Sequence, residues 1–117
     1  MAALRILLVE DDRDVQQMLA SLLEKNGFIV EVAHDGAEAI HVLENGPPPY
    51  AALVDLHMPG IVGQELVEYL EHEPRLSAVR VAIVSASPSL APAGYRVFPK
   101  PLDIQQLLEF LRPRRAA

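Results

Sequence analysis

Five side chains that could take part in chemistry stand where apolar segments of the chain end. They are three carboxylates, a hydroxyl and an ammonium group: Asp11, Asp12, Asp55, Ser85 and Lys100. The apolar runs before them are short and stop at turn residues or charges, which is typical of buried strands. Because ligands bind at the carboxyl ends of the strands in open α/β sheets, we expect the five side chains to share one site.

Three carboxylates at one edge of a sheet would repel one another and raise one another's pKa unless a cation lies between them. We therefore expect a divalent metal ion. Oxygen ligands in a chain without cysteine favour Mg²⁺, which keeps several waters and needs only a few carboxylates. Asp55 can then serve both as a metal ligand and as a nucleophile that takes up a phosphoryl group. Lys100 would neutralise charge on the transferring oxygens, and Ser85 can donate a hydrogen bond to one of them.

The elements that must position these groups follow from the periodicity of the sequence. Five mainly apolar segments predict strands, at residues 4–9, 28–33, 51–55, 79–84 and 95–98. Four amphipathic segments between them predict helices, at residues 13–26, 36–44, 61–73 and 104–112. The apolar stripe of the first helix should face the core: Val15, Met18, Leu19, Leu22 and Leu23. Alternation of strands and helices predicts a doubly wound parallel sheet, because parallel neighbours need crossover connections.

The order of these motifs resembles the receiver domain of bacterial two-component response regulators, including the chemotaxis response regulators. The matching features are an acidic pair after the first strand, an Asp shortly before Met-Pro-Gly, a Ser after the fourth strand and Lys-Pro after the fifth. Their joint order and placement are specific, and the resemblance covers nearly the whole chain. We expect an α/β, flavodoxin-like sheet of five parallel strands in the order 2-1-3-4-5. One receiver domain would span residues 1–112, followed by a short basic tail or linker remnant at residues 113–117.

The resemblance implies a role for each acidic residue. Asp55 would be the phosphoacceptor, Asp12 the direct Mg²⁺ ligand and Asp11 a ligand through water. His57 would offer the metal its backbone carbonyl. Taken alone, Asp11 and Asp12 could instead be helix-capping acids that the helix dipole favours.

It also implies how the phosphoryl group would be held. Lys100 would pair with the acids and with the phosphoryl group, and its bond to Pro101 is expected to be cis. Ser85 would be the hydroxyl that follows the phosphoryl group on activation, and the small Ala86 beside it would leave access open.

The function implied is Mg²⁺-dependent acceptance of a phosphoryl group from phosphohistidine. The donor would be a sensor histidine kinase or a histidine phosphotransfer protein, and phosphorylation would change binding to a downstream protein. Such a domain is not an enzyme in the usual sense, because it would catalyse only its own phosphorylation and dephosphorylation.

Two other functions fit parts of the sequence. A degenerate receiver would keep the fold and bind partners without phosphorylation. Val97, at a position where the family usually has an aromatic residue, and the short spacing from Ser85 to Lys100 favour this alternative. A phosphatase-like hydrolase would use Asp55 as a turnover nucleophile, but its usual second acid two residues later is replaced by His57.

The segment between the fourth and fifth strands departs from the family pattern. Nine residues separate Ser85 from Tyr95, which is barely enough for a crossover helix, and Pro88 and Pro92 interrupt them. We therefore expect the helix after strand four to be shortened or missing. The flank left thinly covered should place Leu90, Tyr95 and Phe98 near a surface used for another contact.

Composition limits the class of protein. A chain of 117 residues, 50% hydrophobic, is long enough for one domain with a core and is not typical of disorder. No apolar run approaches the ~20 residues that span a bilayer, so no membrane insertion is expected. A net charge of −6 argues against direct nucleic-acid binding. The absence of cysteine agrees with a reducing compartment, and we expect a cytoplasmic protein.

Overall fold

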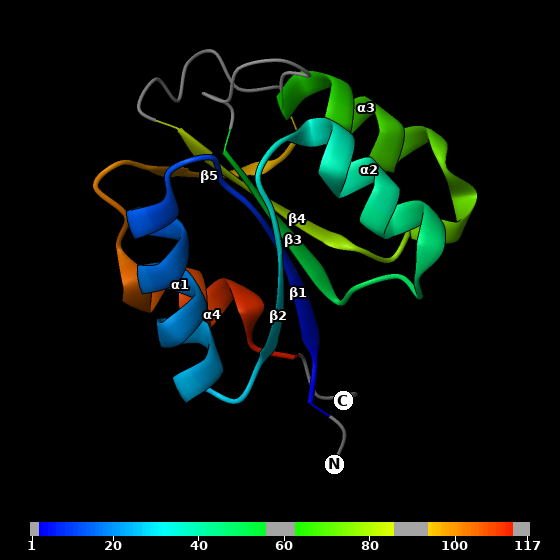
Figure 1. Cartoon of the computed structure of the whole chain (residues 1–117). Coiled ribbons are helices and arrows are strands. Elements are labelled where there is room, and N and C mark those ends of the chain that lie inside the picture. Colours follow the sequence, from blue (N-terminus) through cyan, green and yellow to red (C-terminus); the bar gives the residue numbers. More distant parts are fainter. Residues whose placement is uncertain (1–2, 56–62, 86–93, 114–117) are drawn as a thin grey trace.

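A parallel sheet of five strands forms the centre of the computed structural model, which describes residues 3–55, 63–85 and 94–113 (Figure 1). The strand order is β2-β1-β3-β4-β5, and each neighbouring pair is parallel. The strands are β1 (Arg5–Val9), β2 (Ile29–Ala33), β3 (Ala51–Asp55), β4 (Arg80–Ser85) and β5 (Arg96–Pro99). The predicted fold class and strand order are confirmed.

Helices cover both faces of this sheet. They are α1 (Arg13–Lys25), α2 (Gly36–Asn45), α3 (Gly63–His72) and α4 (Ile104–Leu111), with a 3₁₀ turn η1 at Pro74–Leu76. Figure 1 shows α1 and α4 on one face and α2 and α3 on the other. The predicted shortening or loss of a helix after β4 concerns residues 86–93, which lie outside the described residues and leave that prediction untested. No helix in the described ranges is long and apolar enough to cross a membrane.

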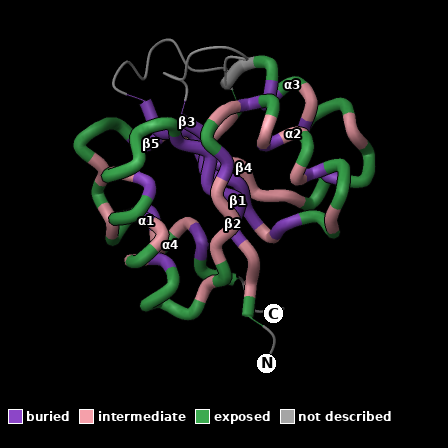
Figure 2. Tube along the Cα trace, viewed as in Figure 1, coloured by how far each residue is buried: buried purple, intermediate pink, exposed green. Residues whose placement is uncertain are grey.

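The core consists of two layers, one on each face of the sheet (Figure 2). Successive side chains of a strand point to opposite faces, so Ile6 and Leu8 pack with α1 and α4, while Leu7 and Val9 pack with α2 and α3. All four are at most 2% exposed. This two-sided burial explains why β1 reads as a continuous apolar run rather than as alternating polar and apolar residues.

One residue of the predicted stripe on α1 is misplaced. Leu19 and Leu23 are buried as expected, but Met18 is 59% exposed and Gln16 is buried instead. The buried face of the helix is centred on residues 16, 19 and 23, which recur every three or four residues, and Met18 lies to one side of that line. Gln16 can be buried because its side-chain amide donates a hydrogen bond to the backbone oxygen of Glu10.

The prediction that Phe98 lies near a surface is wrong. Phe98 is 1% exposed and packs edge-to-face on Phe110 of α4, with 5.6 Å between the ring centroids. The last helix therefore covers the face of β5 to which Phe98 points. Tyr95 is half-buried and its hydroxyl donates a hydrogen bond to Glu71 of α3, and Leu90 lies outside the described residues.

Truncation of Phe98 should test how much this cover contributes to stability. Phe98→Ala should lower the free energy of unfolding by about 3–5 kcal/mol, because it removes a buried ring and leaves a cavity. Met18→Ala, which removes an exposed apolar side chain, should change it by less than about 0.5 kcal/mol. Urea denaturation of both variants and of the parent protein measures the difference. Equal losses in the two variants would contradict the burial of Phe98.

Candidate functional site

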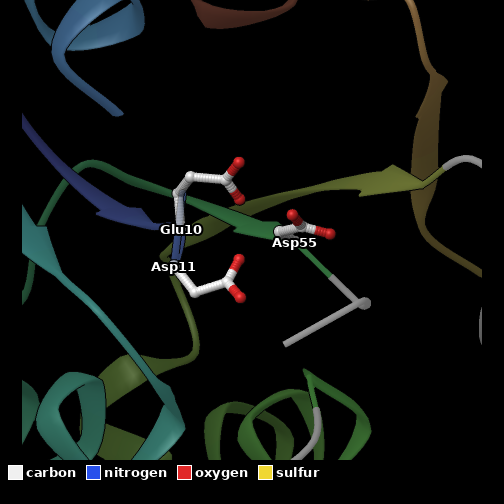
Figure 3. A group of neighbouring side chains, drawn as sticks. All are labelled: Glu10, Asp11 and Asp55. Carbon is white, nitrogen blue, oxygen red and sulfur yellow. The ribbon is translucent and has the colours of Figure 1, made fainter. Parts of the chain in front are cut away.

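The pairing of β1 with β3 brings acids from two strands together. Val9 is the register partner of Val54, so the next residues, Glu10 and Asp55, reach the same edge of the sheet. Glu10, Asp11 and Asp55 offer carboxylate oxygens that all lie within 4.8 Å of one another. Figure 3 shows the three side chains grouped at the carboxyl ends of the two strands. Three oxygen ligands at this spacing suit a hard divalent cation such as Mg²⁺.

Glu10 belongs to this group, although it was not among the site residues predicted from the sequence. Its side chain is buried and its backbone is fixed from two sides. Its N–H donates to the oxygen of Ala33 at 3.0 Å, and its own oxygen accepts from Gln16 at 3.0 Å. The signal that could have found it is its place directly after Val9, the position that matches Asp55 at the end of the neighbouring strand.

Asp12 lies outside the described carboxylate group and caps α1. Its side-chain oxygen accepts hydrogen bonds from the backbone N–H groups of Asp14 and Val15, at 2.9 and 3.2 Å. The capping interpretation, which the sequence left open for Asp11 and Asp12 alike, thus describes the contacts of Asp12, whereas Asp11 faces Glu10 and Asp55.

Lys100 reaches the centre of the acidic group. Its ammonium Nζ lies 2.9 Å from Oδ2 of Asp55, a carboxylate that is only 4% exposed. The backbone helps to position it, because the Lys100 N–H donates to the oxygen of Ser85 and the bond to Pro101 is cis, as expected. Burial alone would lower the pKa of Lys100, but the hydrogen bond and charge of Asp55, with Glu10 and Asp11, raise the pKa above its ordinary value.

Ser85 ends β4 beside this centre. Asp55 is the register partner of Val84, so Ser85 lies one residue beyond Asp55 along the neighbouring strand, and it is 1% exposed. The structure thus brings four of the predicted residues to one edge: Asp11, Asp55, Ser85 and Lys100. His57 and Ala86 lie outside the described residues.

The acidic group has a marked electrostatic consequence for Glu10. Burial, a hydrogen bond shared with Asp55 and the negative charge of Asp55 raise the pKa of Glu10 from 4.5 to about 8. The positive charge of Lys100 acts in the other direction without cancelling the shift. Without a cation, the raised pKa therefore favours the protonated form of Glu10, which lowers the negative charge of the site.

A pocket of about 220 Å³ opens beside the acids. Glu10, Asp55 and Lys100 form its polar part. Apolar residues of β1, α1, β3 and β4, with Pro101 and Leu102, form the rest of its wall. Asp55 is almost fully buried, and this pocket is lined in part by its side chain.

Comparison with known proteins identifies relatives over most of the chain. Residues 6–112 match the family described as the response regulator receiver domain. The response regulator MprA of Mycobacterium ulcerans is 34% identical over 115 residues, which are 94% of this chain and 49% of that protein. The chain therefore spans about half the length of the curated relatives it matches.

Solved structures agree with this match. A sensor protein from Polaromonas is 30% identical with a TM-score of 0.83, and the likeness covers 94% of either chain. Response regulator TrrA of Thermotoga maritima, in complex with Mg²⁺-BeF, has a TM-score of 0.75, covers 92% of this chain and 98% of its own, and at 22% identity supports the fold alone.

The raised pKa of Glu10 predicts a loss of stability with rising pH. Between pH 4.5 and about 8 the native state holds a proton on Glu10 that the unfolded state has released, so the free energy of unfolding falls as pH rises through this window. Glu10→Gln removes the titrating group and should remove this part of the loss. Urea denaturation in a chelating buffer at about pH 6 and about pH 9 measures it. The same pH dependence in parent and variant would exclude Glu10 as its source.

Proposed function

The chain belongs to the response regulator receiver domain family, and we propose that Asp55 is the residue on which it accepts a phosphoryl group. The observation that supports this proposal is the ion pair of Asp55 with Lys100 at 2.9 Å. In addition, an oxygen of Asp55 lies within 4.8 Å of carboxylate oxygens of Glu10 and Asp11. A structural strand-end Asp would need neither a lysine partner nor neighbouring acids.

The residues of this chain suit an in-line transfer. A carboxylate oxygen of Asp55 would attack the phosphorus of a phosphohistidine, forming a P–O bond as the P–N bond breaks and the imidazole leaves with the bonding electrons. Lys100 holds Oδ2 of Asp55, which fixes the plane of the carboxylate, and its charge would offset that of the phosphoryl oxygens. Ser85 stands one strand away, where its hydroxyl could donate to one of those oxygens.

We assign the metal site to Glu10, Asp11 and Asp55, because these three carboxylates lie within reach of one ion. A bound Mg²⁺ would supply positive charge to the phosphoryl oxygens. The TrrA structure with Mg²⁺-BeF agrees with this choice of ion. The ligand set predicted from the sequence contained Asp12 in place of Glu10, together with the carbonyl of His57. The contacts of Asp12 with the first turn of α1 favour Glu10.

Receiver domains are signalling domains rather than conventional enzymes. The donor proposed here is a histidine kinase or a histidine phosphotransfer protein, the output is altered binding to a downstream protein, and the compartment is the cytoplasm. The only chemistry proposed for the chain is its own phosphorylation and dephosphorylation. The presence of Asp55, Lys100 and both acids of the group favours this function over a receiver that works without phosphorylation.

Replacement of Asp55 tests the acceptor directly. Incubation with acetyl phosphate and Mg²⁺ should add one phosphoryl group to the parent protein and none to Asp55→Asn, because the amide is a poor nucleophile. Intact-mass analysis measures the product. Asp35→Asn, which changes an acid that caps α2, serves as a control and should be labelled like the parent. Labelling of Asp55→Asn to the parent's extent would show that another residue is the acceptor.

A pair of matched variants tests the metal site. Mg²⁺ at a hundredfold excess over Kd should stabilise the parent protein by about 2.7 kcal/mol, since only the native state holds the site. Asp11→Asn should lose most of this gain. Asp12→Asn should keep it, because Asn caps a helix as well as Asp does and the proposed ligands are intact. Thermal or urea unfolding with and without Mg²⁺ measures the gain. A gain lost in Asp12→Asn and kept in Asp11→Asn would restore the ligand set predicted from the sequence.

A further inference from the structure

A groove rich in arginine lies at the edge of the sheet opposite the acids. Its volume is about 420 Å³, and it runs between the first residues of β4 and β5 and the second half of α4. Three arginines line it, Arg80, Arg96 and Arg112, together with Glu109 and the ring of Phe110. We call it the arginine groove.

Arg80 is held at the base of this groove by aromatic rings. Its guanidinium carbon lies 4.7 Å from the ring centroid of Phe110 and 5.9 Å from that of Tyr50. Its Nε is buried and has no hydrogen-bond partner among the described residues. Contact with two ring faces stabilises the cation, but it leaves N–H donors that a ring cannot satisfy well.

Arg96 brings a second cation to the same side of the sheet. Its register partner on β4 is Ala82, which follows Arg80 by two residues, so both arginine side chains point towards α4. Arg96 lies over the ring of Phe98 at 4.9 Å and is itself exposed. Arg112, directly after α4, closes the groove from the helix side.

These charges are not neutralised within the part of the chain that the structure describes. None of the three guanidinium groups forms an ion pair or a hydrogen bond there, and Glu109 is the single carboxylate among the described lining residues. The groove thus carries an excess of two positive charges in a chain whose net charge is −6. Packing of its aliphatic stem can explain the partial burial of Arg80. It does not explain why three arginines line the same groove.

We propose that the arginine groove binds a small ligand that carries phosphoryl groups, of the size of a nucleoside diphosphate. A phosphoryl group offers three strong acceptor oxygens, so it can join guanidinium groups that come from three different elements, whereas a carboxylate offers two oxygens in one plane. The volume of about 420 Å³ lies within the ~300–1,000 Å³ range of small-ligand pockets. The exposed guanidinium plane of Arg96 and the wall at Phe110 can stack against a base.

The test titrates the parent protein with three probes in a chelating buffer at about 0.15 M salt, a concentration that screens weak surface attraction. Pyrophosphate and ADP should both bind, and adenosine should not, because the phosphoryl groups carry the interaction. Tighter binding of ADP than of pyrophosphate would identify a nucleotide, and equal binding would identify the phosphoryl groups alone as the recognised feature. Calorimetry measures the affinity, and the Nε–H signal of Arg80 in NMR spectra should shift with either ligand.

Four variants separate the groove from general charge effects. Arg96→Gln should weaken ADP binding by about tenfold, the loss of one charge-assisted contact. Lys25→Gln removes one positive charge from the last residue of α1, which does not line the groove, and should leave the affinity for ADP within about twofold of the parent. Glu109→Gln, which removes the opposing carboxylate, should tighten binding. Asp55→Asn should leave it unchanged, so the result does not depend on the phosphoacceptor.

Three outcomes would overturn the proposal. The first is the absence of saturable binding of pyrophosphate or ADP at concentrations up to about 1 mM. The second is an equal loss of affinity in Arg96→Gln and Lys25→Gln. The third is tighter binding of a short polyglutamate peptide than of either phosphate probe, which would assign the groove to an acidic protein segment instead.

Discussion

The register of β1 against β3 is the constraint on which the site depends. Pairing of Val9 with Val54 forces the residues that follow, Glu10 and Asp55, to share one edge of the sheet. The apolar residues before them are buried on both faces, so a shift of the strand by one residue would move every side chain to the wrong layer. The hydrophobic core therefore holds together acids that would separate if they were free to do so.

That confinement works against stability and in favour of function. Burial and the neighbouring Asp55 carboxylate raise the pKa of Glu10, and the charged form of Lys100 is kept by its acidic neighbours against the desolvation that burial imposes. The ion pair joins the partly exposed ammonium of Lys100 to the buried carboxylate of Asp55, and it contributes little net stability because desolvation of that carboxylate offsets much of the attraction. Its presence at the carboxyl end of the sheet is consistent with a site that binds a cation and reacts with phosphoryl groups. Natural proteins commonly keep such locally unfavourable groups where activity needs them.

The sheet is electrostatically polarised from end to end. The carboxyl ends of β1 and β3 carry acids, and the amino ends of β4 and β5 carry arginines. Glu10 and Asp55 line the pocket beside α1, and Arg80 and Arg96 lie over the rings of Phe110 and Phe98. Among the described residues, the ammonium group of Lys100, directly after β5, forms an ion pair with Asp55.

The sequence by itself determined the class of fold, the strand order and the residues at the centre of the site. Apolar runs, helical stripes and turn residues are local signals, so the five strands and four helices were predicted to within a few residues, and Asp55 and Lys100 were paired correctly across 45 positions. The predicted cis bond at Pro101 was also correct.

Three features were decided by tertiary structure alone. Whether Glu10 or Asp12 joins Asp55 depends on which residue of β1 is the last to pair with β3, and an acidic run of three residues does not encode that register. Met18 is exposed because the rotation of α1 is fixed by its neighbours and by the Gln16 hydrogen bond, not by the widest apolar stripe. Phe98 is buried because α4 packs over β5. The apolar residues of the two elements predict that each has a buried face, but they do not predict which element covers it.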